Sequence, residues 1–245
     1  MSFLRLTLAT LLALCPVKSF AQKVDVKTLE QSVVVLGIRT PQDNVALPVG
    51  TGFFVGPDTI ITAGHVFWQG NQIANGKRSP DGVRMLIPLG DGTQTTLVPV
   101  SLVKSDDVHD VALLRFDRKL TEPLNLKVIP LAIADDGLPD MGMDVILFGH
   151  FETYNVLMGI KGSVGGYLAV LPTVGNVDEL LVSLDANGGF SGGPVISLDS
   201  GKVIGLMEGY LPNPFDPSPS AFAKGISRVV RCKYIRALMD SAAAH

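Results

Sequence analysis

The stretch GGFSGGPV, residues 188–195, places one serine between two pairs of glycines. Glycine adopts backbone angles that other residues resist, so this stretch can form a sharp turn that presents Ser191. In such a turn the backbone N–H groups of Gly189 and Ser191 can converge on one point, an arrangement that stabilises an oxyanion. The alternative interpretation is a glycine-rich hairpin that carries Ser191 incidentally.

Two further residues could act together with this serine. His65 follows the apolar run TIITA and Gly64, which predicts that its imidazole lies at the mouth of a strand. Asp110 directly precedes the apolar run VALLRF, so its carboxylate should enter the fold with a strand and be partly buried. A buried carboxylate without a partner is unfavourable, and an imidazole N–H would satisfy it. For His65 taken alone, a purely structural role is the alternative.

Short runs of aliphatic and β-branched residues, closed by turn residues, cover most of the chain. Their length of about four to eight residues is that of strands, and hairpin connections between them predict an all-β antiparallel fold, a sandwich or barrels. The segment 228–242 differs, because its apolar residues recur at a spacing of three to four, which predicts an amphipathic C-terminal helix. The segment 120–140, rich in proline and turn residues, is the best candidate for a linker between two halves.

The motifs TAGHV, DVALL and GFSGGPV, in this order, resemble the three signature stretches of trypsin-like (chymotrypsin-fold) serine peptidases. The resemblance covers nearly the whole chain beyond residue 21. It implies two antiparallel β-barrels, a C-terminal helix, and an active site in the cleft between the barrels. The implied division is 22–125 for the N-terminal barrel half and 126–245 for the C-terminal half. By the same resemblance, His65 is the general base, Asp110 orients it, Ser191 is the nucleophile, and Gly189 and Ser191 form the oxyanion hole.

Two positions depart from the digestive members of this family. Phe190 stands where those enzymes carry an Asp that pairs with a new N-terminus, so that route of activation is not expected here. The pocket is therefore either preformed or switched in another way, and the chain resembles the bacterial and secreted members without disulfides. Glu208 falls where many relatives have a Ser that contacts the catalytic Asp, and a second carboxylate beside Asp110 would raise the pKa of one of the two.

The resemblance also suggests residues of the substrate pocket. Asp185 lies six residues before Ser191, where a carboxylate would favour basic side chains, although an ordinary turn is the alternative. The run GLMEGY matches the strand that binds the substrate backbone, so Glu208, Gly209 and Tyr210 are further candidates.

The pattern of residues at the N-terminus is typical of an export signal. Arg5 precedes a short apolar run, and the small residues Ser19 and Ala21 suit cleavage after Ala21, which predicts a signal peptide over residues 1–21 and a periplasmic or secreted protein. An N-terminal anchor helix is the alternative. After cleavage no stable membrane insertion is expected. Cys15 leaves with the signal, so we expect Cys232 to be a free, buried and inert thiol, with an intermolecular or reactive thiol as the alternative.

The charge and composition of the chain limit the classes of partner and cofactor that we expect. The chain has 47% apolar and 18% charged residues, which is typical of a globular protein. A net charge of −3, becoming −5 when Arg5 and Lys18 leave with the signal, gives no electrostatic reason to expect a nucleic-acid partner. No zinc-binding spacing of His and Cys occurs, so no metal and no cofactor are expected.

These observations predict a serine endopeptidase that hydrolyses protein or peptide substrates through an acyl-enzyme. A catalytically silent protein-binding module on the same scaffold is the principal alternative, and an esterase is a third hypothesis.

Overall fold

The structure is a computed structural model that describes residues 25–39, 46–75, 82–89, 94–151, 156–171, 175–186, 188–212 and 222–244. The predicted signal peptide, most of the proline-rich stretch 211–220 and His245 lie outside these residues, and export therefore stays a prediction.

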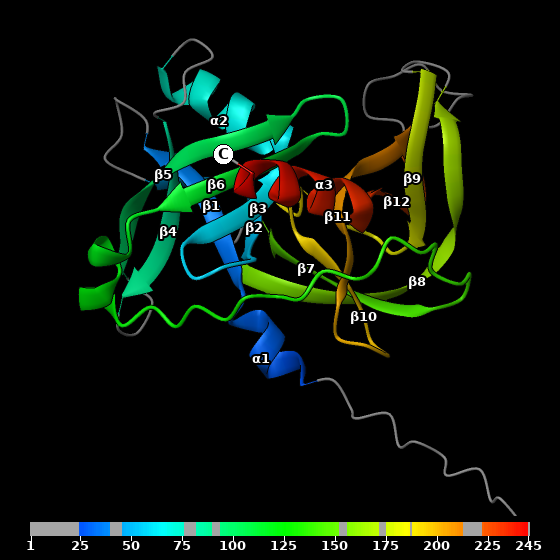
Figure 1. Ribbon diagram of the computed structural model, residues 1–245, viewed down its shortest axis with the longest axis horizontal. Coiled ribbons are helices and arrows are strands. Elements are labelled where there is room, and N and C mark those ends of the chain that lie inside the picture. Colours follow the sequence, from blue (N-terminus) through cyan, green and yellow to red (C-terminus); the bar gives the residue numbers. More distant parts are fainter. Residues whose placement is uncertain are drawn as a thin grey trace, which may run out of the picture.

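The chain forms two closed barrels of six antiparallel strands each, which confirms the predicted fold class (Figure 1). The first barrel closes in the order β1-β2-β3-β6-β5-β4 and the second in the order β7-β8-β9-β12-β11-β10, so both halves share one topology. The strands of the first barrel are β1 (Val33–Arg39), β2 (Ala46–Phe54), β3 (Thr59–Ala63), β4 (Val83–Leu89), β5 (Gln94–Asp106) and β6 (Val111–Phe116). Those of the second are β7 (Asp144–Phe151), β8 (Val156–Leu171), β9 (Gly175–Ser183), β10 (Pro194–Ser197), β11 (Val203–Pro212) and β12 (Phe222–Arg231).

Helices occupy the edges of this architecture. They are α1 (Val26–Glu30), α2 (Gly64–Asn75) and α3 (Cys232–Ala243), with the short 3₁₀ turns η1 (Arg118–Leu120) and η2 (Glu122–Leu124) in the connection between the barrels. Figure 1 shows α3, in red, crossing back over the first barrel. Among the described residues, no helix is both long enough and apolar enough to cross a bilayer.

The predicted C-terminal helix is present but starts later than expected. Residues 228–231 belong to β12, where Val229 pairs with Met207 on one side and Leu180 on the other. The expectation of a helix from 228 was wrong because Val229 fits both a helical spacing and the alternation of a strand, and barrel closure selects the strand. The helix proper begins at Cys232 and buries Ile235 and Leu238.

The apolar core continues from one barrel into the other. One cluster of buried residues joins Phe53 and Phe54 of the first barrel to Phe148 and Leu206 of the second and to Ile235 of α3. Because β7 faces this interface as well as its own barrel, six consecutive residues from Val145 to His150 are buried. The connection is bonded to both halves, since the N–H of Leu131 donates to Phe54 and that of Ala134 to Val203. The two barrels are therefore held in a fixed relation.

Phe190 anchors the serine-bearing turn in the second barrel. Its side chain is fully buried in the apolar cluster of that barrel. It lies against Gly149 of β7, where an added Cβ would overlap the Phe190 ring and come within 2.9 Å of its Cα. Glycine at position 149 is thus required for Phe190 to enter the core.

We expect Gly149→Ala to destabilise the fold by about 1–3 kcal/mol, because the new methyl group must displace the Phe190 ring from a packed site. Gly166→Ala is a matched control, since a Cβ at Gly166 of β8 meets nothing within 4 Å. Urea unfolding of both variants measures the difference. Equal midpoints for the two variants would contradict the packing described for Phe190.

Candidate active site

His65 is brought close to Asp110 by the segment that joins β3 to α2. The N–H of Gly64 donates to the Asp110 carbonyl at 2.9 Å. A Cβ at Gly64 would lie 3.0 Å from Asp110 Oδ1 and 3.5 Å from its Cα, so a larger residue would crowd the aspartate. As expected from the sequence, the small residue before His65 permits a close approach of the backbone.

The Asp110 carboxylate makes two hydrogen bonds to His65. Oδ2 lies 2.6 Å from Nδ1 of the imidazole, and Oδ1 accepts the backbone N–H of His65 at 2.7 Å. Asp110 adopts a left-handed backbone with φ of 55°, an uncommon conformation for a residue other than glycine. Because carboxylate oxygens accept both bonds, the Nδ1 proton lies between the two side chains, and Nε2 is free to accept a proton.

The environment of His65 favours its protonated form. Burial of the ring acts to lower the pKa of His65, but the hydrogen bond and negative charge of Asp110, with the charge of Glu208, raise it above its usual value of 6.5. The imidazole is therefore a stronger base than a free histidine.

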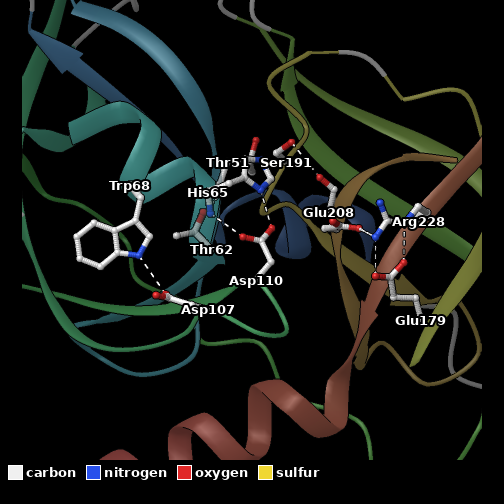
Figure 2. A network of polar contacts seen from close by, with 10 residues as sticks. All are labelled: Thr51, Thr62, His65, Trp68, Asp107, Asp110, Glu179, Ser191, Glu208 and Arg228. Atoms are coloured by element: carbon white, nitrogen blue, oxygen red, sulfur yellow. Dashed lines mark hydrogen bonds and ion pairs between the residues drawn. The ribbon is translucent and has the colours of Figure 1, made fainter. Parts of the chain in front are cut away.

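Ser191 reaches the same point from the second barrel. Figure 2 shows its side chain next to the His65 ring, and backbone contacts agree: the N–H of Thr51 donates to the Ser191 carbonyl at 2.9 Å. A Cβ at Gly192 would lie 2.8 Å from the N of Ala63, so the turn touches the segment that carries His65. The Ser191 hydroxyl makes a long hydrogen bond of 3.4 Å to the carbonyl of Glu208. Within the described chain, no hydrogen bond joins Ser191 to His65.

The turn directs its carbonyl groups into the protein. The carbonyl of Gly189 accepts the Thr51 hydroxyl at 2.7 Å, and that of Phe190 accepts the N–H of Gly193 at 2.9 Å. By contrast, the N–H groups of Gly189 and Ser191 donate to no acceptor in the part of the chain that the structure describes. Gly189 has φ of 92°, which glycine adopts without strain. The N–H groups of Gly189 and of Ser191 itself are therefore two donors that no described residue accepts.

A buried ionic cluster lies beyond Asp110, as Figure 2 shows. Arg228 of β12 forms a bidentate pair with Glu179 of β9, with both N–O distances at 2.7 Å. The same guanidinium lies 2.6 Å from Oε2 of Glu208, an ion pair whose angles are poor for a hydrogen bond. The three side chains are between 11% and 20% exposed. Two carboxylates therefore share one cation in a largely water-free site.

This arrangement raises the pKa of Glu208. Burial, followed by the charge of Glu179, raises the pKa of Glu208 to about 7, with a smaller contribution from Asp110 and opposition from Arg228. From the sequence we expected a raised pKa because of the charge of Asp110, whereas burial and the charge of Glu179 contribute more in the structure. Glu208 thus exchanges its proton near neutral pH rather than near 4.5.

The other pocket candidates are less tightly defined. Asp185 has an exposed side chain just before the serine-bearing turn. Gly209 faces open space, because a Cβ there would meet nothing within 4 Å, and Tyr210 is half-buried. Their roles in substrate binding stay predictions.

The remaining described histidines have structural contacts. His109 Nδ1 lies 2.7 Å from Asp106, and its ring stacks on Tyr234 of α3 with 3.6 Å between centroids. His150 is buried, and its backbone N–H donates to the Thr51 hydroxyl at 2.8 Å. Cys232 is a free, buried cysteine, and burial raises the pKa of its thiol, which disfavours the reactive thiolate. The described residues contain no group of three or more side chains arranged to hold a metal ion.

Sequence reasoning missed Thr51, Arg228 and Glu179. The only local indication for Thr51 was its position between two glycines in GTGFFV. Arg228 and Glu179 are 49 residues apart and meet only because β12 pairs with β9.

Comparisons with known proteins agree with the two-barrel fold. The trypsin-like peptidase domain matches residues 50–206, which include His65, Asp110 and Ser191. Among solved structures, the active form of the Rv3671c protease from M. tuberculosis aligns with a TM-score of 0.64 and 22% identity, over 88% of this chain and 82% of that one. An inactive form of Rv3671c from M. tuberculosis H37Rv, a Ser-to-Ala mutant, aligns with a TM-score of 0.59 and 21% identity, over 89% and 90%. No curated protein matches the sequence closely enough to count as a relative.

We expect the pKa of Glu208 to make stability depend on pH. Since the folded state raises this pKa from 4.5 to about 7, the contribution of Glu208 is fully present below pH 4.5 and is lost as pH rises through 7. Between pH 5 and pH 8 the wild type should lose roughly 1–3 kcal/mol of unfolding free energy that Glu208→Gln does not lose. Urea unfolding across this range measures it, with Glu122→Gln, at an exposed position, as the control. Parallel pH profiles for wild type and Glu208→Gln would contradict the assignment.

Proposed function

This chain belongs to the trypsin-like peptidase family, and on that premise we propose that it is a serine endopeptidase with His65, Asp110 and Ser191 as its catalytic triad. Protein or peptide substrates follow from the family. The observation that carries the proposal is the His65–Asp110 pair, with 2.6 Å between Nδ1 and Oδ2, at the point where the serine-bearing turn meets the first barrel.

The chemistry begins with the serine hydroxyl. Because Asp110 holds the proton on Nδ1 of His65, Nε2 presents a lone pair. The Ser191 hydroxyl leaves the Glu208 carbonyl by rotation about its side-chain bond and donates to Nε2 instead. Its oxygen then attacks the substrate carbonyl while Nε2 takes the proton.

The negative charge that develops on the substrate oxygen needs donors that are already in place. The N–H groups of Gly189 and Ser191 can supply them without reorganisation, because no acceptor among the described residues occupies them. Collapse of the tetrahedral species transfers the proton from His65 to the leaving amine and leaves Ser191 acylated. A water molecule, deprotonated by the same imidazole, then hydrolyses the ester and restores the hydroxyl.

Covalent labelling tests the nucleophile. A fluorophosphonate probe should label the wild-type protein and should not label Ser191→Ala, since the probe reacts with an activated serine. Ser197→Ala is the matched control, because Ser197 lies on β10 and is buried away from the site. It should be labelled like the wild type. Absence of labelling of the wild type under all conditions would favour the catalytically silent binding module.

The pH dependence tests the general base. Activity falls as His65 becomes protonated, and because its pKa is raised above 6.5, half-maximal kcat/KM on the acid side should lie above pH 6.5. The charge of Glu208 contributes to this rise, so Glu208→Gln should move the midpoint to lower pH. Initial rates on a peptide substrate between pH 5 and pH 9 provide the measurement. A midpoint well below 6.5 in the wild type would exclude His65 as the base in the environment described here.

A further inference from the structure

The serine-bearing turn requires something to hold it open. Gly188, Gly189, Gly192 and Gly193 give this stretch much backbone freedom, so its peptide groups could rotate and lose the orientation of the two donors. Phe190 anchors the turn from below by burying its ring. The packed Phe190 ring fixes the position of the turn, but it has no polar group that could form a hydrogen bond to the carbonyl groups of the turn.

Thr51 of the first barrel forms hydrogen bonds to these carbonyl groups. Its side chain is completely buried, and its hydroxyl donates to the Gly189 carbonyl at 2.7 Å. The hydroxyl is itself oriented, because it accepts the N–H of His150 at 2.8 Å. The backbone N–H of Thr51 donates to the Ser191 carbonyl at 2.9 Å, and its carbonyl accepts the Thr62 hydroxyl at 2.6 Å. Every polar group of this residue is engaged.

These contacts act on the peptides that surround the oxyanion donors. The hydroxyl fixes the peptide between Gly189 and Phe190, and the backbone N–H fixes the peptide between Ser191 and Gly192. The peptide between them is held by Gly193, whose N–H donates to the Phe190 carbonyl. The N–H of Ser191 belongs to the peptide whose carbonyl Gly193 holds, and the N–H of Gly189 directly precedes the peptide that the Thr51 hydroxyl holds. Both donors therefore lie in or beside a peptide group that is fixed by a hydrogen bond.

We propose that Thr51 is a positioning residue, whose hydroxyl holds the oxyanion turn in its donor-outward conformation in the absence of an ion pair at position 190. This inference rests on the proposed peptidase function. The hydroxyl fixes the turn in the way that an ion pair of the residue before the nucleophile would fix it. It belongs to β2, and it is 138 residues away from Gly189 in the sequence. The turn is preformed as soon as the two barrels are in contact, with no cleavage of the chain.

The experiment removes the hydroxyl and keeps the shape of the side chain. Thr51→Val abolishes the donor to Gly189, whereas Thr51→Ser retains it. Thr121→Val is the matched control, because Thr121 is also a buried threonine whose hydroxyl donates to a backbone carbonyl, that of Arg118, in the connection between the barrels. If Thr51→Val does not fold, Thr51→Ala replaces it, since the smaller side chain introduces no new contact.

We expect Thr51→Val to lower kcat on a peptide substrate by about 10²–10³-fold, the usual effect of losing one oxyanion donor, with little change in KM. Thr51→Ser should recover most of the loss, and Thr121→Val should retain wild-type kcat. A peptide boronate, whose hydroxyl occupies the oxyanion position, should bind Thr51→Val more weakly by a similar factor. The product peptide from the amine side of the cleaved bond, which places no oxygen at the oxyanion position, should bind both proteins equally.

Three outcomes would overturn the inference. The first is a Thr51→Val variant with the kcat and the boronate affinity of the wild type. The second is a Thr51→Ser variant as impaired as Thr51→Val, and the third is a Thr121→Val variant that loses as much activity as Thr51→Val. A wild type without Ser191-dependent turnover would refute the proposed function instead. The inference is then decided by the crystal structure of Thr51→Val, in which a rotated Gly189–Phe190 peptide supports it and an unchanged one overturns it.

Discussion

The hydrogen bond from the N–H of Thr51 to the carbonyl of Ser191 crosses the boundary between the two barrels, and the geometry of the site depends on it. His65 and Asp110 belong to the first barrel, while Ser191 and its flanking donors belong to the second. Neither barrel contains a complete site. The shared apolar cluster, with Phe148 of β7 and Ile235 of α3, brings the halves together, and the Thr51 contacts join them at the serine-bearing turn.

The ionic cluster shows how the protein accommodates an unusual carboxylate near Asp110. A guanidinium between Glu179 and Glu208 leaves one negative charge uncompensated in a buried site, and such a charge is unfavourable. A proton on Glu208 relieves it, which is why the pKa of that residue rises to about 7. Near neutral pH, Glu208 therefore changes its charge close to His65, although Glu208 has no role in the proposed bond-making and bond-breaking steps. The same residue also provides the carbonyl that accepts the Ser191 hydroxyl.

Local sequence patterns predicted much of this structure, and the reasons are physical. Short apolar runs closed by turn residues identified most strands, and the resemblance to trypsin-like peptidases led to the two barrels and to the family. The patterns were insufficient where a residue fits both the helical spacing and the strand alternation, as Val229 does. They were also insufficient where two interacting residues are far apart in the sequence. Thr51 is an example, because nothing near it in the chain indicates that its hydroxyl meets Gly189. The pairing of Arg228 with Glu179 likewise follows only from strand order in the barrel.

The long sequence separation of the cross-barrel contacts bears on how the protein matures. Most strand pairs within each barrel join segments that are near each other along the chain, whereas the contacts of Thr51 with the serine-bearing turn close a loop of 138 residues. Long-range contacts form late, because the chain entropy of closing such a loop opposes them until other structure is in place. A chain with only its first barrel folded would therefore lack the serine-bearing turn beside His65 and could not carry out the proposed hydrolysis.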